Sequence, residues 1–234
     1  MTGHIVPMGA GKAVMERRND PLHSYVLELT GKDDPVVLFV PTATGDEASY
    51  IVSFYEAFHS GRCRPRHLRL FHRDFDDLTD IVVGADVIHV GGGNTANMLA
   101  IWRVHGVDKA LRAAWERGVV LAGWSAGAIC WFEGGLTDSF GPDLGPLKDG
   151  LKLLSGTFCP HYDSESLRRP RYEQLVGSGA LGDGFAADDG VGLLFEGRNF
   201  SEAVASLPGQ HAYRVERRRG SSVEETQVRA RLLR

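Results

Sequence analysis

Three continuous apolar runs constrain the fold of this chain more than any other feature. They lie at Pro35–Pro41, Ala85–Val90 and Gly118–Ala122. Because apolar residues follow one another without alternation, the runs predict strands buried on both faces, as in a parallel sheet. The segments between them carry apolar residues at helical spacing and predict helices at 46–59, 95–105 and 107–117. Strands that alternate with helices predict a three-layer α/β sandwich with a mostly parallel sheet and right-handed crossovers.

The second half of the chain has a different pattern. Residues 132–150 are rich in Gly, Pro and Asp and lack a clear period, so we expect an irregular loop there. A helical pattern returns at 164–176. After Gly190, short runs at Val191–Phe195, Ala212–Val215 and Val223–Leu232 predict antiparallel strands with turns at 196–199 and 219–222. We find no linker or repeat, so we expect a single domain over residues 1–234.

The composition excludes several classes of function. The chain has 43% hydrophobic and 24% charged residues with a net charge of −4, which gives no reason to expect nucleic acid or an anionic membrane as a partner. No apolar run is long enough to span a membrane, and the N-terminus lacks the features of a signal peptide. The three cysteines and nine histidines follow no disulfide or metal-binding pattern. We therefore expect a cytoplasmic protein without metal or cofactor.

The segment Gly123–Gly127, with sequence Gly-Trp-Ser-Ala-Gly, has the context of a nucleophile elbow. It follows an apolar strand and precedes residues that can continue as a helix. The glycines permit a sharp turn that would hold the Ser125 hydroxyl clear of its neighbours, and the N–H groups that open the helix would face developing negative charge. An ordinary strand-to-helix turn also explains such a pattern, so the serine needs partners elsewhere in the chain.

A base and an acid follow the serine in sequence. His161 comes after a short apolar run and Pro160, at the expected end of a strand. Asp138 lies within the expected loop, so the chain order is Ser125, Asp138, His161. In a triad the histidine takes the serine proton and the carboxylate orients the imidazole. Three other acidic residues compete with Asp138 for the last role: Glu133, Asp143 and Asp163.

Three glycines, Gly91–Gly93, leave the second apolar run and are followed by Asn94. Consecutive glycines let backbone N–H groups approach a ligand. The segment fits neither nucleotide-binding pattern, Gly-x-Gly-x-x-Gly or the Walker motif. We therefore expect an oxyanion hole formed by the N–H groups of Gly92 and Ala126, with Gly93 and Asn94 in substrate binding.

Four segments in this order resemble the peptidase E (aspartyl dipeptidase) and cyanophycinase family of serine peptidases. They are Val-Gly-Gly-Gly-Asn-Thr, Gly-Trp-Ser-Ala-Gly-Ala, Leu-Thr-Asp-Ser and Cys-Pro-His-Tyr, and the resemblance extends over about residues 36–176. It implies a fold related to class I glutamine amidotransferases, with serine in place of cysteine. It also implies Ser125 as nucleophile, His161 as base and Asp138 as acid.

The resemblance also implies a substrate: a short peptide from which an N-terminal aspartate is removed. Arg168 occupies a place similar to the arginine that holds the acidic side chain in peptidase E, and a guanidinium suits that task. Alternatively, Arg168, Arg169 and Arg171 form the exposed start of a helix. Cyanophycinase-like or carboxypeptidase-like exopeptidase activity and non-catalytic binding of a small acidic ligand are left open, as is a homodimer. An α/β-hydrolase esterase ranks lower, because only 36 positions separate Ser125 from His161, whereas that fold normally has several helices and strands between its serine and its histidine.

Overall fold

The structure of this chain is a computed structural model that describes residues 3–9, 17, 20–58, 61–73, 75 and 77–234. Its helices, including two short 3₁₀ segments, are α2 (Pro21–Glu28), η1 (Thr42–Thr44), α3 (Ala48–Ala57), α4 (Leu78–Val83), α5 (Thr95–His105), α6 (Val107–Glu116), α7 (Ala126–Ile129), α8 (Arg168–Ser178) and η2 (Arg219–Ser221). Its strands are β1 (His4–Gly9), β2 (Val36–Val40), β3 (Arg64–His67), β4 (Val87–Val90), β5 (Val120–Trp124), β6 (Gly134–Thr137), β7 (Gly145–Leu147), β8 (Thr157–Cys159), β9 (Gly184–Ala187), β10 (Val191–Glu196), β11 (Asn199–Ala205), β12 (His211–Arg217), β13 (Val223–Arg229) and β14 (Arg231–Leu232).

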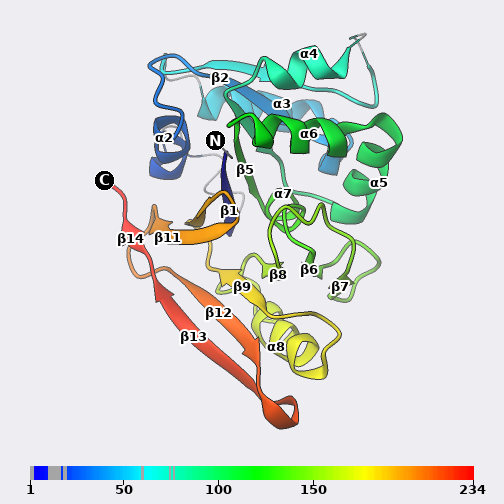
Figure 1. The fold of residues 1–234 in the computed structure, drawn as a ribbon, viewed down its shortest axis with the longest axis vertical. Coiled ribbons are helices and arrows are strands. Elements are labelled where there is room, and N and C mark those ends of the chain that lie inside the picture. Colours follow the sequence, from blue (N-terminus) through cyan, green and yellow to red (C-terminus); the bar gives the residue numbers. More distant parts are fainter. Residues whose placement is uncertain (1–2, 10–16, 18–19, 59–60, 74, 76) are drawn as a thin grey trace.

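The larger of two sheets has the strand order β14-β11-β10-β1-β5-β4-β2-β3 (Figure 1). Strands β1, β5, β4, β2 and β3 run parallel, and β10 and β11 extend the sheet in antiparallel fashion. The three apolar runs of the sequence form β2, β4 and β5 in its interior. The predicted mostly parallel sheet is therefore confirmed.

Helices cover both faces of this sheet. Successive side chains of a strand point to opposite faces, so each strand contributes to the core on both sides. Leu38, Ile88 and Val90 belong to the core that also holds α5, α6 and α7, whereas Val37 and Val87 belong to the core beneath α2 and α3. This arrangement explains why the strands are continuously apolar: each residue is buried from one side or the other. The predicted three-layer sandwich is confirmed.

The helix predicted at 95–105 has the expected bounds, and the neighbouring helix ends one residue earlier than predicted. Gly106 separates the two helices with φ 75°, a left-handed conformation that favours glycine. The helix predicted at 46–59 is the shorter α3. The helix predicted at 164–176 begins four residues later, at Arg168.

The second sheet, with strand order β13-β12-β9-β8-β6-β7, packs one face against α8 (Figure 1). Two of its strands, β6 and β7, arise from residues 132–150, so the prediction of an irregular loop over that whole segment is wrong. Gly134 and Gly135 make the pairing possible. A Cβ at either position would collide with a carbonyl oxygen of a neighbouring strand, Leu147 for Gly134 and Phe158 for Gly135.

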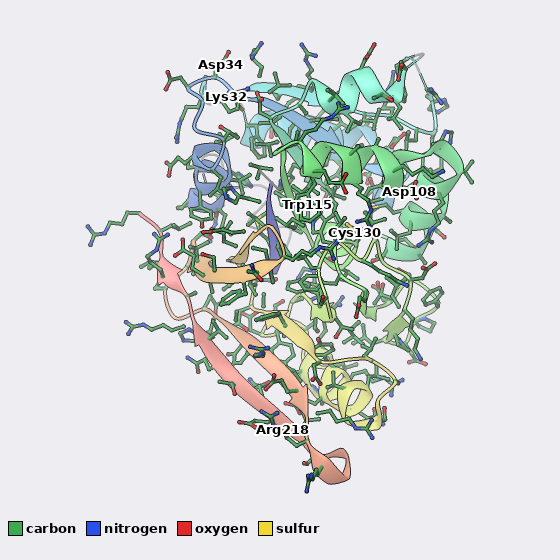
Figure 2. All side chains as sticks on the ribbon, in the orientation of Figure 1. Lys32, Asp34, Asp108, Trp115, Cys130 and Arg218 are labelled. Carbon is green, nitrogen blue, oxygen red and sulfur yellow. The ribbon has the colours of Figure 1, made fainter. Side chains whose placement is uncertain are left out.

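The antiparallel strands predicted after Gly190 are present, but the run predicted over Val223–Leu232 is divided into β13 and β14, and β14 pairs in parallel with β11. β10 and β11 form a hairpin in which Glu196 pairs with Asn199, and β12 and β13 form a second hairpin that leaves the main body (Figure 1). Arg218 lies near the tip of the second hairpin, where it pairs with Glu216 and Glu224 (Figure 2). The basic run Arg217–Arg219 therefore lies at a turn and is neutralised in part by its own hairpin.

Among the described residues, no helix combines the length and the hydropathy that crossing a bilayer requires.

Candidate active site

Ser125 lies at the sharp turn between β5 and α7, where its backbone has φ 52° and ψ −114°. A positive φ is unusual for a residue with a side chain and marks a strained position of the kind found at active sites. The flanking glycines allow the turn: a Cβ on Gly123 would collide with the Gly127 carbonyl, and a Cβ on Gly127 with the Val90 carbonyl. The segment therefore has the backbone of a nucleophile elbow, as predicted.

The Ser125 side chain is the part of this turn that solvent reaches. All other residues from 120 to 132 are buried, whereas Ser125 is partly exposed. Its hydroxyl has no hydrogen-bond partner within the described part of the chain. A hydroxyl held above a buried strand and helix is available to a substrate.

The glycine loop between β4 and α5 lies against Ser125. An ideal Cβ on Gly92 would be 3.3 Å from the Ser125 Cβ, so only glycine permits this approach without displacement. The Gly92 N–H donates to the Tyr50 hydroxyl at 2.8 Å. The donor that we predicted for the oxyanion hole is therefore already engaged. The N–H groups of Gly93 and Ala126 have no partner among the described residues.

Asn94 has a structural position in this loop. Its side-chain oxygen accepts from the Asn97 N–H at 2.8 Å and caps α5, and its amide group donates to the Ser139 carbonyl at 3.1 Å. Both ends of the side chain are thus engaged within the protein. The substrate-binding role predicted for Asn94 receives no support from this geometry.

His161 follows β8 and pairs with an acid that the sequence analysis did not consider. Its Nδ1 lies 2.7 Å from Asp189 Oδ1, and both side chains are largely buried. Because a carboxylate can only accept, we assign the proton of the imidazole to Nδ1, which leaves Nε2 as the basic nitrogen. The His161 backbone has φ 56°, so His161 and Ser125 both occupy positive-φ positions.

The acid chosen from the sequence, Asp138, is not the partner of His161. It follows β6, its side chain is exposed, and its carboxylate makes no hydrogen bond or ion pair with described residues. Of the competitors, Glu133 accepts the Gly156 N–H at 3.1 Å. Asp163 accepts the Asp189 N–H at 2.8 Å and so orients the acid rather than the base.

Asp189 was missed because its relation to His161 is tertiary. β8 and β9 are parallel neighbours, with Cys159 opposite Ala186, so the residues that follow the two strands emerge at the same edge. The sequence signal was present in Ala-Ala-Asp-Asp-Gly, a short apolar run that ends in two carboxylates. Recognising it required the pairing of two very short strands.

Backbone contacts connect Ser125 to the His161–Asp189 pair through the end of β1. The Ser125 N–H donates to the Met8 carbonyl at 3.2 Å. The next residue, Gly9, is so close to the segment after β9 that a Cβ on it would collide with the Ala187 carbonyl. The Tyr162 N–H, beside His161, donates to that same carbonyl at 3.1 Å. The carboxyl ends of β1, β5, β8 and β9 therefore meet at one place.

Arg168 does not have the exposed position expected of a substrate clamp. Its side chain is 4% exposed, its Nε donates to Glu165 at 2.7 Å, and its Nη1 donates to the Leu136 carbonyl at 3.3 Å. The alternative of a fully exposed basic cluster is also wrong for this residue. Arg169 instead pairs with Glu225, and Arg171 donates to the Leu144 carbonyl.

No group of three or more His, Cys, Asp or Glu side chains within the described ranges is arranged to hold a metal ion.

Comparisons with known proteins assign the chain to a family of peptidases. A family model described as peptidase family S51 matches residues 5–203. The chain is 50% identical over 211 residues to the uncharacterized peptidase YgaJ of Bacillus subtilis (strain 168), covering 90% of this chain and 91% of YgaJ. It is 30% identical over 126 residues to peptidase E of Actinobacillus pleuropneumoniae serotype 5b (strain L20), covering 50% and 54% of the two chains.

Two crystal structures share the fold. A peptidase from an acI-B1 Actinobacterium superposes with a TM-score of 0.71 at 16% identity, over 98% of this chain and 95% of the other. A candidate peptidase E from Listeria monocytogenes EGD-e superposes with a TM-score of 0.59 at 18% identity, over 98% and 100%. At these sequence identities the superpositions show a shared fold and nothing further.

Proposed function

The chain belongs to peptidase family S51 and is a peptidase, and from this premise we propose that it is a serine exopeptidase acting on short peptides. Ser125 is the nucleophile, His161 the base and Asp189 the acid that orients the imidazole. The observation that carries most of this proposal is the His161–Asp189 hydrogen bond, which lies where the carboxyl ends of strands from both sheets meet and the strained elbow presents a partly exposed serine.

The chemistry follows from these positions. His161 Nε2 takes the proton of the Ser125 hydroxyl as Oγ attacks the carbonyl carbon of the scissile peptide bond. The resulting oxyanion faces the Ala126 N–H at the start of α7 and an N–H of the glycine loop. The imidazolium gives its proton to the leaving amine, and a water molecule then hydrolyses the acyl-enzyme by the same route.

Labelling with a fluorophosphonate tests the nucleophile. We expect modification of Ser125 in the folded protein, no modification of Ser125→Ala, and strongly reduced labelling of His161→Ala. An unreactive serine in folded protein would instead favour a binding protein that does not hydrolyse its ligand.

A second candidate is the narrower activity of an aspartyl dipeptidase, which the similarity to peptidase E favours. That activity requires a cation facing the acidic side chain of the substrate. The Arg168 side chain is buried and is engaged by the half-exposed Glu165, so an acidic side chain of the substrate would have to displace Glu165 from the guanidinium. We therefore place the general exopeptidase first.

A dipeptide library separates the two candidates. Under the first we expect Asp-X peptides to have no advantage in kcat/KM over other dipeptides, and Arg168→Gln to leave the order of preference unchanged. A preference for Asp-X that is lost in Arg168→Gln would establish the second.

A further inference from the structure

Tyr50, in the first turn of α3, connects the two segments that flank the candidate nucleophile. Its hydroxyl oxygen accepts the Gly92 N–H at 2.8 Å and the Trp124 Nε1–H at 2.6 Å. Its ring packs edge-on against Phe39, with centroids 5.3 Å apart. Burial raises the pKa of the phenol, so the hydroxyl stays neutral at physiological pH.

Both donors lie next to the reacting groups. Trp124 immediately precedes Ser125, and Gly92 belongs to the glycine loop. An ideal Cβ on Gly92 would be 3.3 Å from Ser125 Cβ and 3.4 Å from Trp124 Cδ1, so the loop, the indole and the serine are in contact. A single hydroxyl therefore sets the distance between the loop and the strand that ends in the nucleophile.

This contact also changes which N–H groups can face an oxyanion. The Gly92 N–H points to Tyr50, whereas those of Gly93 and Ala126 have no partner among the described residues. Gly93 is held in place on the other side: its φ is 133°, and a Cβ on it would collide with the Ala43 carbonyl. The Asn94 N–H donates to that carbonyl at 2.8 Å.

We propose that Tyr50 is a positioning residue of this active site: its hydroxyl anchors Gly92 and Trp124 and leaves the N–H groups of Gly93 and Ala126 as the oxyanion donors. The inference rests on the proposed function, since it assigns parts within the same site. Tyr50 acts through the glycine loop and does not touch the reacting atoms. Its contribution appears in the transition state, where the position of the donors matters most.

Tyr50→Phe removes the hydroxyl and keeps the ring against Phe39. Because small displacements of catalytic groups cost up to about a hundredfold in rate, we expect kcat to fall roughly 10- to 100-fold while KM changes less than about threefold. Affinity for a peptide aldehyde, which forms an oxyanion on Ser125, should fall in parallel with kcat/KM. Affinity for a product amino acid should not change.

Tyr55→Phe is the matched control. Tyr55 lies on the same helix, and its hydroxyl is hydrogen-bonded to His67 Nδ1 at 2.8 Å, so the same oxygen is removed from another contact. We expect kcat of this variant to stay within about twofold of the unchanged protein. Equal kcat values for Tyr50→Phe and Tyr55→Phe would overturn the inference.

The indole N–H resonances give a readout that is independent of catalysis. The chain has four tryptophans. The Nε1 groups of Trp102 and Trp115 donate to Thr42 and Gly3, and that of Trp131 is buried with no hydrogen-bond partner among the described residues. In ¹⁵N–¹H spectra we expect Tyr50→Phe to shift the Trp124 indole resonance, assigned with Trp124→Phe, and to leave the other three in place. An unmoved Trp124 resonance would contradict the proposed contact.

Two further variants separate this inference from the proposed function. If Ser125→Ala keeps its activity, the serine mechanism fails, and the inference about its oxyanion site fails with it. If Ser125→Ala is inactive but Tyr50→Phe keeps full kcat, only the role of Tyr50 fails. Trp124→Phe removes one of the two donors to the Tyr50 hydroxyl and replaces Tyr50→Phe as the test if that variant does not fold. A fall in kcat of Trp124→Phe without a matching rise in KM supports the inference, and an unchanged kcat opposes it.

Discussion

At the scale of single residues, the sequence indicated two members of the proposed triad, Ser125 and His161, but not the carboxylate that pairs with His161 in the structure. Ser125 and His161 carry local signals: glycines around one, and a strand end with proline before the other. Asp189 carries none of comparable strength, because an aspartate before a glycine is typical of any turn. Its hydrogen bond to His161 depends on the parallel pairing of β8 with β9, which is not visible in local patterns.

The choice between the two aspartates can be tested by isosteric substitution. Asp189→Asn keeps the size of the side chain but no longer stabilises the imidazolium and can select the wrong tautomer, so we expect kcat to fall about a thousand- to ten-thousandfold. Asp138→Asn is the control and should change kcat less than about fivefold, since that carboxylate is exposed and without a partner in the described structure. Steady-state kinetics on a short peptide measures both. A larger loss in Asp138→Asn would restore the acid chosen from the sequence.

The turn at Ser125 depends on a glycine that no other residue can replace. A Cβ on Gly127 would collide with the Val90 carbonyl, a backbone atom that cannot move aside cheaply. We expect Gly127→Ala to lower the free energy of unfolding by about 3 kcal/mol, at the upper end for overpacking, and to abolish labelling of Ser125. Gly182→Ala meets no atom within 4 Å and should leave both unchanged. Urea unfolding and fluorophosphonate labelling provide the two measurements, and similar behaviour of the two variants would refute the argument.

At the scale of elements, predictability followed the strength of the pattern. β2, β4 and β5 are continuous apolar runs, and α5 has a periodic face with a glycine at its end, so their positions were evident. β6 has a single large apolar residue, Leu136, between two glycines and a threonine, and β8 has three residues. Such segments become strands because neighbours pair with them, which is a property of the assembled sheet.

One contact joins α8, the second hairpin and the segment that carries His161. Glu225 on β13 accepts from the Tyr162 hydroxyl at 2.7 Å and pairs with Arg169 on α8. The Arg169 guanidinium also lies over the rings of Tyr162 and Tyr213, at 5.3 and 5.0 Å from their centroids. Since Tyr162 follows His161 directly, this cluster anchors the segment that carries the proposed base.

Removing Glu225 should therefore destabilise the protein more than removing its neighbour. We expect Glu225→Ala to lower the free energy of unfolding by about 2 kcal/mol, because a mostly buried carboxylate with two partners is lost. Glu224→Ala, on the same strand, breaks only an exposed pair with Arg218 and should cost less than about 1 kcal/mol. Chemical denaturation of the two variants decides the matter, and equal losses would show that the cluster adds little.

At the scale of the whole molecule, two buried histidines lie in the core beneath the active-site end of the sheet. The ring centroid of His89 on β4 is 4.0 Å from that of Trp124, and the ring centroid of His23 on α2 is 4.7 Å from that of Phe58. None of their four ring nitrogens has a hydrogen-bond partner in the described structure. Burial lowers the pKa of His23 to about 4 and holds the pKa of His89 well below its ordinary value, so both rings are neutral when the protein is folded.

These histidines make the fold sensitive to acid. In the unfolded chain the imidazole of His23 takes up a proton near pH 6.5, whereas in the folded protein it does so near pH 4. The contribution of the neutral ring to the free energy of unfolding is therefore complete above pH 6.5 and falls as the pH drops from 6.5 to 4. For His23 alone the loss is roughly 3 kcal/mol at pH 4. His23→Phe should reduce this loss and raise stability at pH 7 by about 1 kcal/mol, because it removes two unpaired buried nitrogens. His72→Phe, at an exposed position, should leave the pH dependence unchanged. Denaturant unfolding from pH 4 to 8 measures the slope; an unchanged slope in His23→Phe would place the source of acid sensitivity elsewhere.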